Sequence, residues 1–89
     1  MSGETVYLRS FTLPRRVLPG YRRKLIAKLV YAVSYRTRDL TGHDDREEDT
    51  IDAFWTGEID TWGKLTFKRI DGEDTHYLFP DELVSVDDY

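Results

Sequence analysis

The sequence predicts one small, mainly β domain, and three observations carry this prediction. The chain has 89 residues, enough for one hydrophobic core and too few for two. Its apolar residues come in short runs rich in β-branched and aromatic side chains, bounded by Pro, Gly and Asp-Gly. Two Trp, six Tyr and four Phe offer large rings, which fill a thin core efficiently.

The N-terminal part, residues 1–28, is expected to form a strand followed by a basic arm. Residues 5–13 (TVYLRSFTL) have strand propensity and stop at Pro14. Pro19-Gly20 marks a turn, which leaves residues 14–24 as a loop or arm. Residues 21–28 stay open, because their apolar positions fit both one face of a short helix and a period-2 extension of the next strand.

The middle of the chain contains a strand and then a long acidic stretch. Residues 29–37 alternate and are rich in Val and Tyr, so we expect a strand there. Residues 40–53 are almost devoid of apolar side chains before Ile51, which predicts a long solvated loop.

The C-terminal part predicts a regular succession of strands and turns. Gly57 lies inside one predicted strand, where it indicates a bulge or sharp bend, and Asp71-Gly72 is typical of a hairpin turn. In order, we expect strand 54–59, turn 60–63, strand 64–70, hairpin turn 71–72, strand 76–79, a helical turn 80–83 with Pro80 at its first position, and strand 84–86. The candidate core residues are Phe54, Ile59, Leu65, Phe67, Leu78, Leu83 and Val86.

This succession resembles the end of an SH3-like barrel, the group of small barrels that includes SH3, Tudor and KOW-type domains. The resemblance lies in Gly57-x-Ile59, Gly63-Lys64-Leu65, Asp71-Gly72, and Phe79-Pro80 with Leu83-Val84 after it. It implies that residues 29–87 form a barrel of strongly bent antiparallel strands, to which residues 1–28 are appended. Residues 39–53 would then take the place of the long RT-type loop. The turn carries Glu82-Leu83 where the peptide groove of SH3 domains has a Tyr, so the resemblance implies the fold and not recognition of proline-rich peptides.

Charge is divided unevenly along the chain. Residues 1–39 contain nine Lys or Arg against two acidic residues, a balance of +7, whereas residues 40–89 contain four against fifteen, a balance of −11. Such asymmetry indicates a charged partner, unless the two halves pack together and neutralise each other. Both alternatives remain open from the sequence.

Several function classes find no support in the sequence. Without Cys there is no disulfide, thiolate metal site or thiol nucleophile. The serines have no His and acid partner at a recognisable spacing, and no Gly-rich phosphate loop occurs. His43 lies among carboxylates, but their spacing does not match a calcium loop. We therefore predict no enzymatic activity, no cofactor and no metal.

The chain has no apolar N-terminal leader and no long apolar run, so we expect a cytoplasmic protein that does not bind membranes.

The predicted function is a protein–protein interaction module that places an acidic surface on a basic partner. Small acidic proteins of phages and mobile elements act as inhibitors or adaptors in this way, and the size and charge of the chain resemble theirs. The candidate partner-binding residues are Asp44, Asp45, Glu47, Glu48, Asp49 and the turn residue Trp62.

The alternative is a nucleic-acid-binding protein that uses the basic arm, with guanidinium groups for phosphates and an aromatic ring for stacking. Its candidate residues are Arg15, Arg16, Tyr21, Arg22, Arg23 and Lys24. The acidic pI of about 5.1 counts against nucleic-acid binding.

An exposed edge, such as that of the N-terminal strand, also offers a second copy of the chain a surface for pairing as a homodimer.

Overall fold

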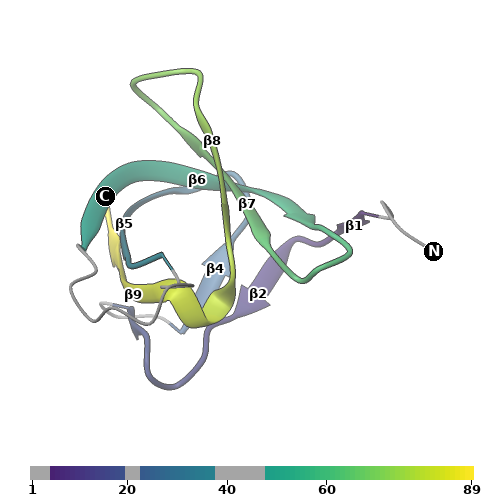
Figure 1. Ribbon diagram of the computed structural model, residues 1–89, viewed down its shortest axis with the longest axis horizontal. Helices are drawn as coiled ribbons and strands as arrows, with labels where there is room; N and C mark the ends of the chain where they lie inside the picture. The colour runs from purple at the N-terminus through teal and green to yellow at the C-terminus, as the bar shows by residue number, and fades with distance from the viewer. Residues whose placement is uncertain (1–4, 20–22, 38–47) are drawn as a thin grey trace.

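The computed structural model describes residues 5–19, 23–37 and 48–89, and it is mainly β (Figure 1). One sheet has the strand order β3-β9-β5-β6-β7-β8, with β1 paired to the far end of β6, and β2 and β4 form a second, two-stranded sheet. All pairings are antiparallel except β3 with β9. The strands are β1 (Val6–Tyr7), β2 (Ser10–Thr12), β3 (Leu18–Pro19), β4 (Lys24–Ile26), β5 (Val30–Tyr35), β6 (Asp49–Ile59), β7 (Leu65–Arg69), β8 (Thr75–Leu78) and β9 (Leu83–Asp88).

The larger sheet is strongly curled. β8 and β9 are separated by four strand spacings in the sheet order, which would be about 19 Å in a flat sheet. The chain nevertheless passes from Leu78 at the end of β8 to Leu83 at the start of β9 in five residue steps, a reach of at most about 17 Å when fully extended. Much of that link is the 3₁₀ turn η1 (Pro80–Glu82), which is far shorter than an extended chain. The two ends of the sheet must therefore approach each other, as the curve of β6 in Figure 1 shows.

The core lies inside this curl and includes side chains from the N-terminal part. Trp55, Phe67 and Val33 are completely buried at its centre. The small β2–β4 sheet packs against them, with the Phe11 ring 6.2 Å from the Trp55 ring in a T-shaped contact. Predicted core residues Leu65, Phe67, Leu78, Leu83 and Val86 are buried, and Ile59 packs against them. Residues of the predicted basic arm and its flanks, Leu13, Val17 and Leu25, belong to the same core, so this segment is more than an appendage.

The C-terminal predictions are largely confirmed. The turn at residues 60–63, the strand after it and the 3₁₀ turn that begins at Pro80 all form. The β7–β8 hairpin also forms, but its loop is longer than the predicted two-residue turn at Asp71-Gly72, because β7 ends at Arg69 and β8 begins at Thr75. Glu82 holds the 3₁₀ turn in place, because its Oε1 accepts a hydrogen bond from the Phe79 N–H at 2.8 Å. The Glu82 carbonyl accepts a further bond from the Arg36 N–H at 2.9 Å, which ties the turn to the end of β5.

The predicted bend at Gly57 is confirmed, and it allows β6 to pair with several neighbours. The β6–β7 register shifts between Trp55 and Ile59, and Gly57 has a φ of +95°. The Leu8 N–H donates to the Gly57 carbonyl at 2.6 Å, so the backbones of β6 and the N-terminal strand approach closely here. A Cβ on Gly57 would lie 2.6 Å from the Leu8 carbonyl oxygen, a distance that real Cβ atoms do not adopt.

The structure corrects the N-terminal strand predictions. Residues 5–13 form two strands, because β1 pairs with β6 whereas β2 pairs with β4 on the opposite edge. The segment 21–28, left open above, contains β4 and then a turn at Lys28, whose φ of +75° separates it from β5. In the described part of the chain it is neither a helix nor a continuous extension of β5, and the 3₁₀ turn η1 is the sole helical element there.

Two predictions around β6 are wrong. The acidic stretch 40–53 is not a loop to its end, because residues 49–53 form the first half of β6 and pair with β5. Phe54 is not a core residue, since Ile51, Ala53 and Trp55 point inward and Phe54 lies on the other face. The run Phe54-Trp55 has two aromatic residues at consecutive positions, and only the pairing register decides which of them faces the core.

Replacing Gly57 by Ala is expected to destabilise the fold by about 1–3 kcal/mol, because Ala disfavours a positive φ and its Cβ would strike the Leu8 carbonyl. The free energy of unfolding, measured in urea, checks this. Gly72→Ala is the matched control, since a Cβ there meets nothing within 4 Å. Equal losses in the two variants would contradict the argument.

Candidate interaction surfaces

Several of the described carboxylates lie on the strands and the hairpin around the middle of β5. Ala32 of β5 is paired with Asp52 on β6 and with Asp87 on β9, which places these two acids on one face on either side of it. The Ile70 N–H donates to the Asp52 carbonyl at 3.1 Å, which brings the β7–β8 hairpin beside them. We call the resulting group the acidic surface. It comprises Asp52, Asp71, Glu73, Asp74 and Asp87, together with the exposed Asp88 at the end of β9, which pairs with Tyr31 and so starts from the opposite face of the sheet.

The sequence located only part of this region. Asp44, Asp45 and Glu47 lie outside the described residues. Glu48 and Asp49 are exposed at the start of β6, next to the acidic surface but not on the face of Asp52. The hairpin and C-terminal acids were missed, because the three segments that carry them become neighbours only through sheet pairing.

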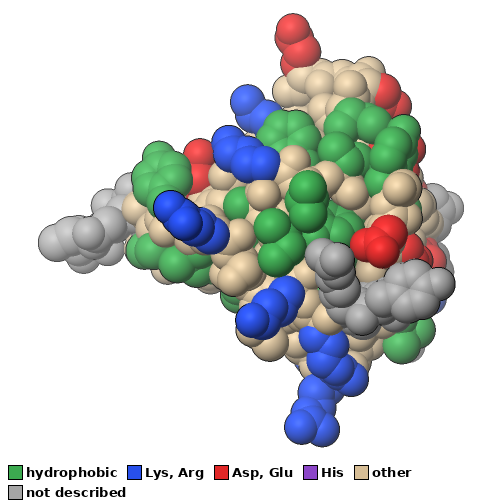
Figure 2. Space-filling model, turned by 180° about the vertical axis from the view of Figure 1, so that it is seen from behind, with side chains coloured by type: hydrophobic (Ala, Val, Ile, Leu, Met, Phe, Trp, Pro, Cys, Tyr) green, Lys and Arg blue, Asp and Glu red, His purple; other side chains and the backbone are tan. Residues whose placement is uncertain are grey.

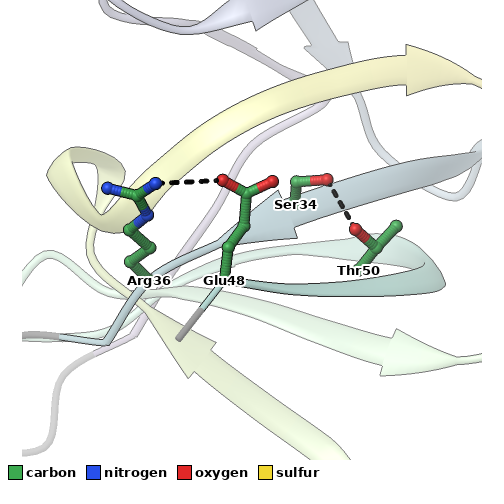
Figure 3. A network of polar contacts seen from close by, with 4 residues as sticks. All are labelled: Ser34, Arg36, Glu48 and Thr50. Atoms are coloured by element: carbon green, nitrogen blue, oxygen red, sulfur yellow. Dashed lines mark hydrogen bonds and ion pairs between the residues drawn. The ribbon is translucent and has the colours of Figure 1, made fainter. Parts of the chain in front are cut away.

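Glu48 takes part in a short polar row between β5 and β6 (Figure 3). The Arg36 Nη2 lies 3.5 Å from the Glu48 Oε1, and both side chains are about half exposed. Beside this ion pair, the Ser34 and Thr50 hydroxyl groups are 2.8 Å apart and share a hydrogen bond. Glu48 is therefore partly neutralised, and an exposed pair of this kind contributes little to stability.

Trp62 lies exposed on a turn whose backbone is hydrogen-bonded. It is 66% exposed in the β6–β7 turn, as the sequence predicted. The Asp60 Oδ1 accepts hydrogen bonds from the Trp62 and Lys64 N–H groups at 3.0 and 2.8 Å, and the Asp60 carbonyl accepts one from the Gly63 N–H at 3.0 Å. An exposed indole on a preorganised turn has the properties of an interface anchor.

The basic residues predicted for nucleic-acid contact form a second charged group. The Val17 N–H donates to the Pro14 carbonyl at 3.0 Å, which closes a turn with Arg15 and Arg16 at its tip. The Leu13 N–H donates to the Arg23 carbonyl at 2.7 Å, so the segment that follows lies beside this turn. We call Arg15, Arg16, Arg23 and Lys24 the basic cluster. All four are exposed, whereas Tyr21 and Arg22 lie outside the described residues.

The basic cluster and the acidic surface do not neutralise each other. Arg36–Glu48 and Arg69–Asp71 are ion pairs between described residues, and neither involves the basic cluster. In Figure 2 the Lys and Arg side chains lie mainly toward the left and bottom, and most Asp and Glu toward the top and right. Of the two alternatives left open by the sequence, neutralisation between the two halves is seen in the described part of the chain only at the Arg36–Glu48 pair, and the basic cluster takes no part in it.

A shallow groove of about 310 Å³ lies beside the 3₁₀ turn. It is open to solvent, and both signs of charge line it together with apolar side chains: Arg16, Leu18, Arg36, Asp81, Glu82, Leu83 and Val84. The groove touches the basic cluster through Arg16. Its mixed lining does not define one ligand chemistry.

The rings of Tyr35 and His76 are in contact. Their rings are 5.9 Å apart, although they come from β5 and β8, which are not neighbours in the sheet. Burial raises the pKa of the Tyr35 phenol, the Asp49 carboxylate raises it further, and Arg69 lowers it. The His76 Nε2 is buried and has no hydrogen-bond partner in the described structure.

Arg69 forms a two-bond pair with Asp71 at 3.0 and 3.2 Å. These hydrogen bonds lower the pKa of Asp71.

No group of three or more His, Cys, Asp or Glu that could hold a metal ion occurs within residues 5–19, 23–37 and 48–89. Over the same ranges, no helix has the length and apolar character needed to cross a membrane.

Comparisons with protein-family models, curated proteins and solved structures gave no significant match. The functional argument therefore depends on the surfaces described above.

Tyr35 is expected to make the fold sensitive to alkaline pH. Its pKa is raised in the folded state, so the stability gained from the neutral phenol is complete below the usual value of 10.0 and is lost as pH rises above it. The unfolding free energy of the wild-type protein should fall relative to Tyr35→Phe above about pH 10. Parallel pH profiles for the two proteins would contradict this expectation.

Proposed function

We propose that the protein is a non-enzymatic interaction module that binds a basic protein partner through its acidic surface, as an inhibitor or adaptor. The observation that carries the proposal is the separation of charge in the folded chain. Asp52, Glu73 and Asp88 are exposed and form no ion pair within the described structure, while the basic cluster lies on other strands. An acidic face with several unpaired carboxylates attracts a basic surface, accelerates encounter and disfavours acidic partners.

We also propose that the fold is an SH3-like barrel. The curl required by the short link from β8 to β9 supports this, as do the sharp bend at Gly57 and the 3₁₀ turn before the last strand. The contact between Tyr35 and His76 across the interior is a further feature of a closed arrangement. The fold supports the scaffold only, and the function is argued from the surfaces.

The acidic surface should control binding of the partner. The partner is first captured on the immobilised protein with nuclease present, identified by mass spectrometry and purified. Its affinity for Asp52→Asn/Glu73→Gln/Asp88→Asn should then fall by about tenfold, at roughly half a kcal/mol for each rim charge. Binding to the wild-type protein should weaken as salt is raised, and this dependence should be smaller for the variant.

The matched control is the basic-cluster variant Arg15→Gln/Arg16→Gln/Arg23→Gln/Lys24→Gln, which should keep its affinity for the basic partner. Circular dichroism of both variants checks that they remain folded. A complex that is insensitive to salt and to the acidic substitutions would refute the electrostatic docking.

Nucleic-acid binding is a second candidate function, and the basic cluster favours it. Its four cations are exposed, adjacent and without ion pairs to the described residues, so they remain available for phosphate groups. The remainder of the protein opposes this function, because the net charge is −4 and the acidic surface repels a phosphate backbone.

Fluorescence anisotropy with labelled single- and double-stranded oligonucleotides tests the second candidate. If the basic cluster binds phosphates, its neutralised variant should lose affinity, and the slope of log K against log salt should shrink by about 0.9 for each lost contact on duplex DNA. The acidic-surface variant should bind as well as the wild-type protein or better. Equal affinity of wild type and basic-cluster variant would exclude this use of the cluster.

A further inference from the structure

β1 has one bonded edge and one free edge, and the hydrogen-bond register shows which backbone groups face each. β1 pairs with β6 through Val6↔Ile59 and Tyr7↔Glu58, and the Leu8 N–H donates to the Gly57 carbonyl. In an antiparallel ladder, residues two apart bond to the same neighbour. Val6 and Leu8 therefore bond toward β6, and the N–H and C=O of Tyr7 point away from it.

Further along the chain, β4 covers this outer edge, but β4 does not reach as far as Tyr7. The Arg9 carbonyl accepts from the Ala27 N–H at 2.9 Å, and the Leu13 N–H donates to the Arg23 carbonyl, so β4 covers the outer edge from Arg9 onward. Beyond Ala27 the chain turns away at Lys28. Within residues 5–19, 23–37 and 48–89, Tyr7 thus presents both backbone groups on an open edge, and its side chain is 74% exposed.

A row of apolar side chains also ends at this edge. The cross-strand pairs Leu78–Leu65, Leu65–Ile59 and Ile59–Val6 place four apolar residues on one face of β8, β7, β6 and β1. Leu78 and Leu65 are buried and Ile59 is half-buried, but Val6 is 54% exposed. The row continues from the core to the edge of the sheet, and among the described strands none pairs with β1 on the side away from β6.

We propose that the free edge of β1 pairs antiparallel with β1 of a second copy of this chain, forming a two-fold symmetric dimer. An edge strand is its own complement under two-fold symmetry, because each copy supplies the donor and the acceptor that the other needs. The second copy continues the apolar row with its own Val6, which buries both valines. Residues 5–8 carry no charge, so pairing brings no like charges into opposition.

The register of the dimer follows from the backbone. Only registers that pair Tyr7 with another outward-bonding residue form hydrogen bonds. Centring the dimer on Tyr7 would place Thr5 of the second copy beside Arg9, whose carbonyl is already bonded to Ala27. Centring it on Val6 avoids this and pairs Tyr7 of each copy with Thr5 of the other. Val6 then faces Val6 at a close, non-hydrogen-bonded position, where side chains make the most contact.

The dimer does not depend on the proposed function, because the acidic surface lies on other strands. Three residues from each copy make an interface well below the usual total of about 1,600 Å², so we expect reversible association. Sedimentation velocity from about 10 µM to about 1 mM should show the wild-type chain passing from monomer to dimer. A protein that is monomeric throughout this range overturns the proposal.

Charged variants at Val6 test the register. Val6→Lys and Val6→Glu should each be monomeric, because like charges would face each other across the two-fold axis, and mixing the two should restore a heterodimer. Leu29→Lys is the matched control, since Leu29 is 48% exposed and lies outside β1, and it should dimerise as the wild type does. If Val6→Lys still dimerises, or if the mixture stays monomeric, the β1 pairing is wrong.

Discussion

The bend of β6 at Gly57 is the constraint on which the rest of the structure depends. β6 has eleven residues and pairs with β5 along its first half, with β7 along its second half, and with β1 near its end. A straight strand of that length could not follow the curl of the sheet. The positive φ at Gly57 turns the strand, and the absent side chain lets Leu8 bond directly to it. The bend therefore sets the curvature of the sheet and the position of the N-terminal strand together.

Trp55 connects this bend to the hydrophobic core. Its ring is completely buried and meets Phe11 of the small sheet, while its Nε1 donates to the Glu58 carbonyl at 2.9 Å across the bend. The Lys28 N–H donates to the Trp55 carbonyl at 2.8 Å, which attaches the turn before β5. One residue thus links the curled sheet to the N-terminal segment, and a chain this short has few other large side chains with which to do so.

The curl also decides which surfaces the protein presents. It brings the start of β6, the end of β9 and the β7–β8 hairpin around Ala32, and the carboxylates of these three segments form the acidic surface. The basic cluster lies at the start of β4 and on the turn before β3. β3 borders β9, but among the described residues no ion pair joins the cluster to the acidic surface. If the β1 edge pairs as proposed, each dimer carries two acidic surfaces, and a partner with repeated basic sites would bind with higher avidity than one copy achieves.

The sequence by itself determined the local elements. Pro80, the alternation in residues 29–37 and the Gly at position 57 each impose a backbone geometry through their own chemistry, and the corresponding 3₁₀ turn, strand and bend all form. Asp71-Gly72 predicted the place of the hairpin but not the length of its loop, which separates Arg69 from Thr75. The sequence also determined the division of charge and the exposed Trp62. Only the tertiary structure decided that residues 5–13 split between two partners, that Trp55 and not Phe54 faces the core, and that Asp52, Asp87 and the hairpin acids share a surface. Pairing partner and register depend on contacts between distant segments, and residue propensities carry no information about those contacts.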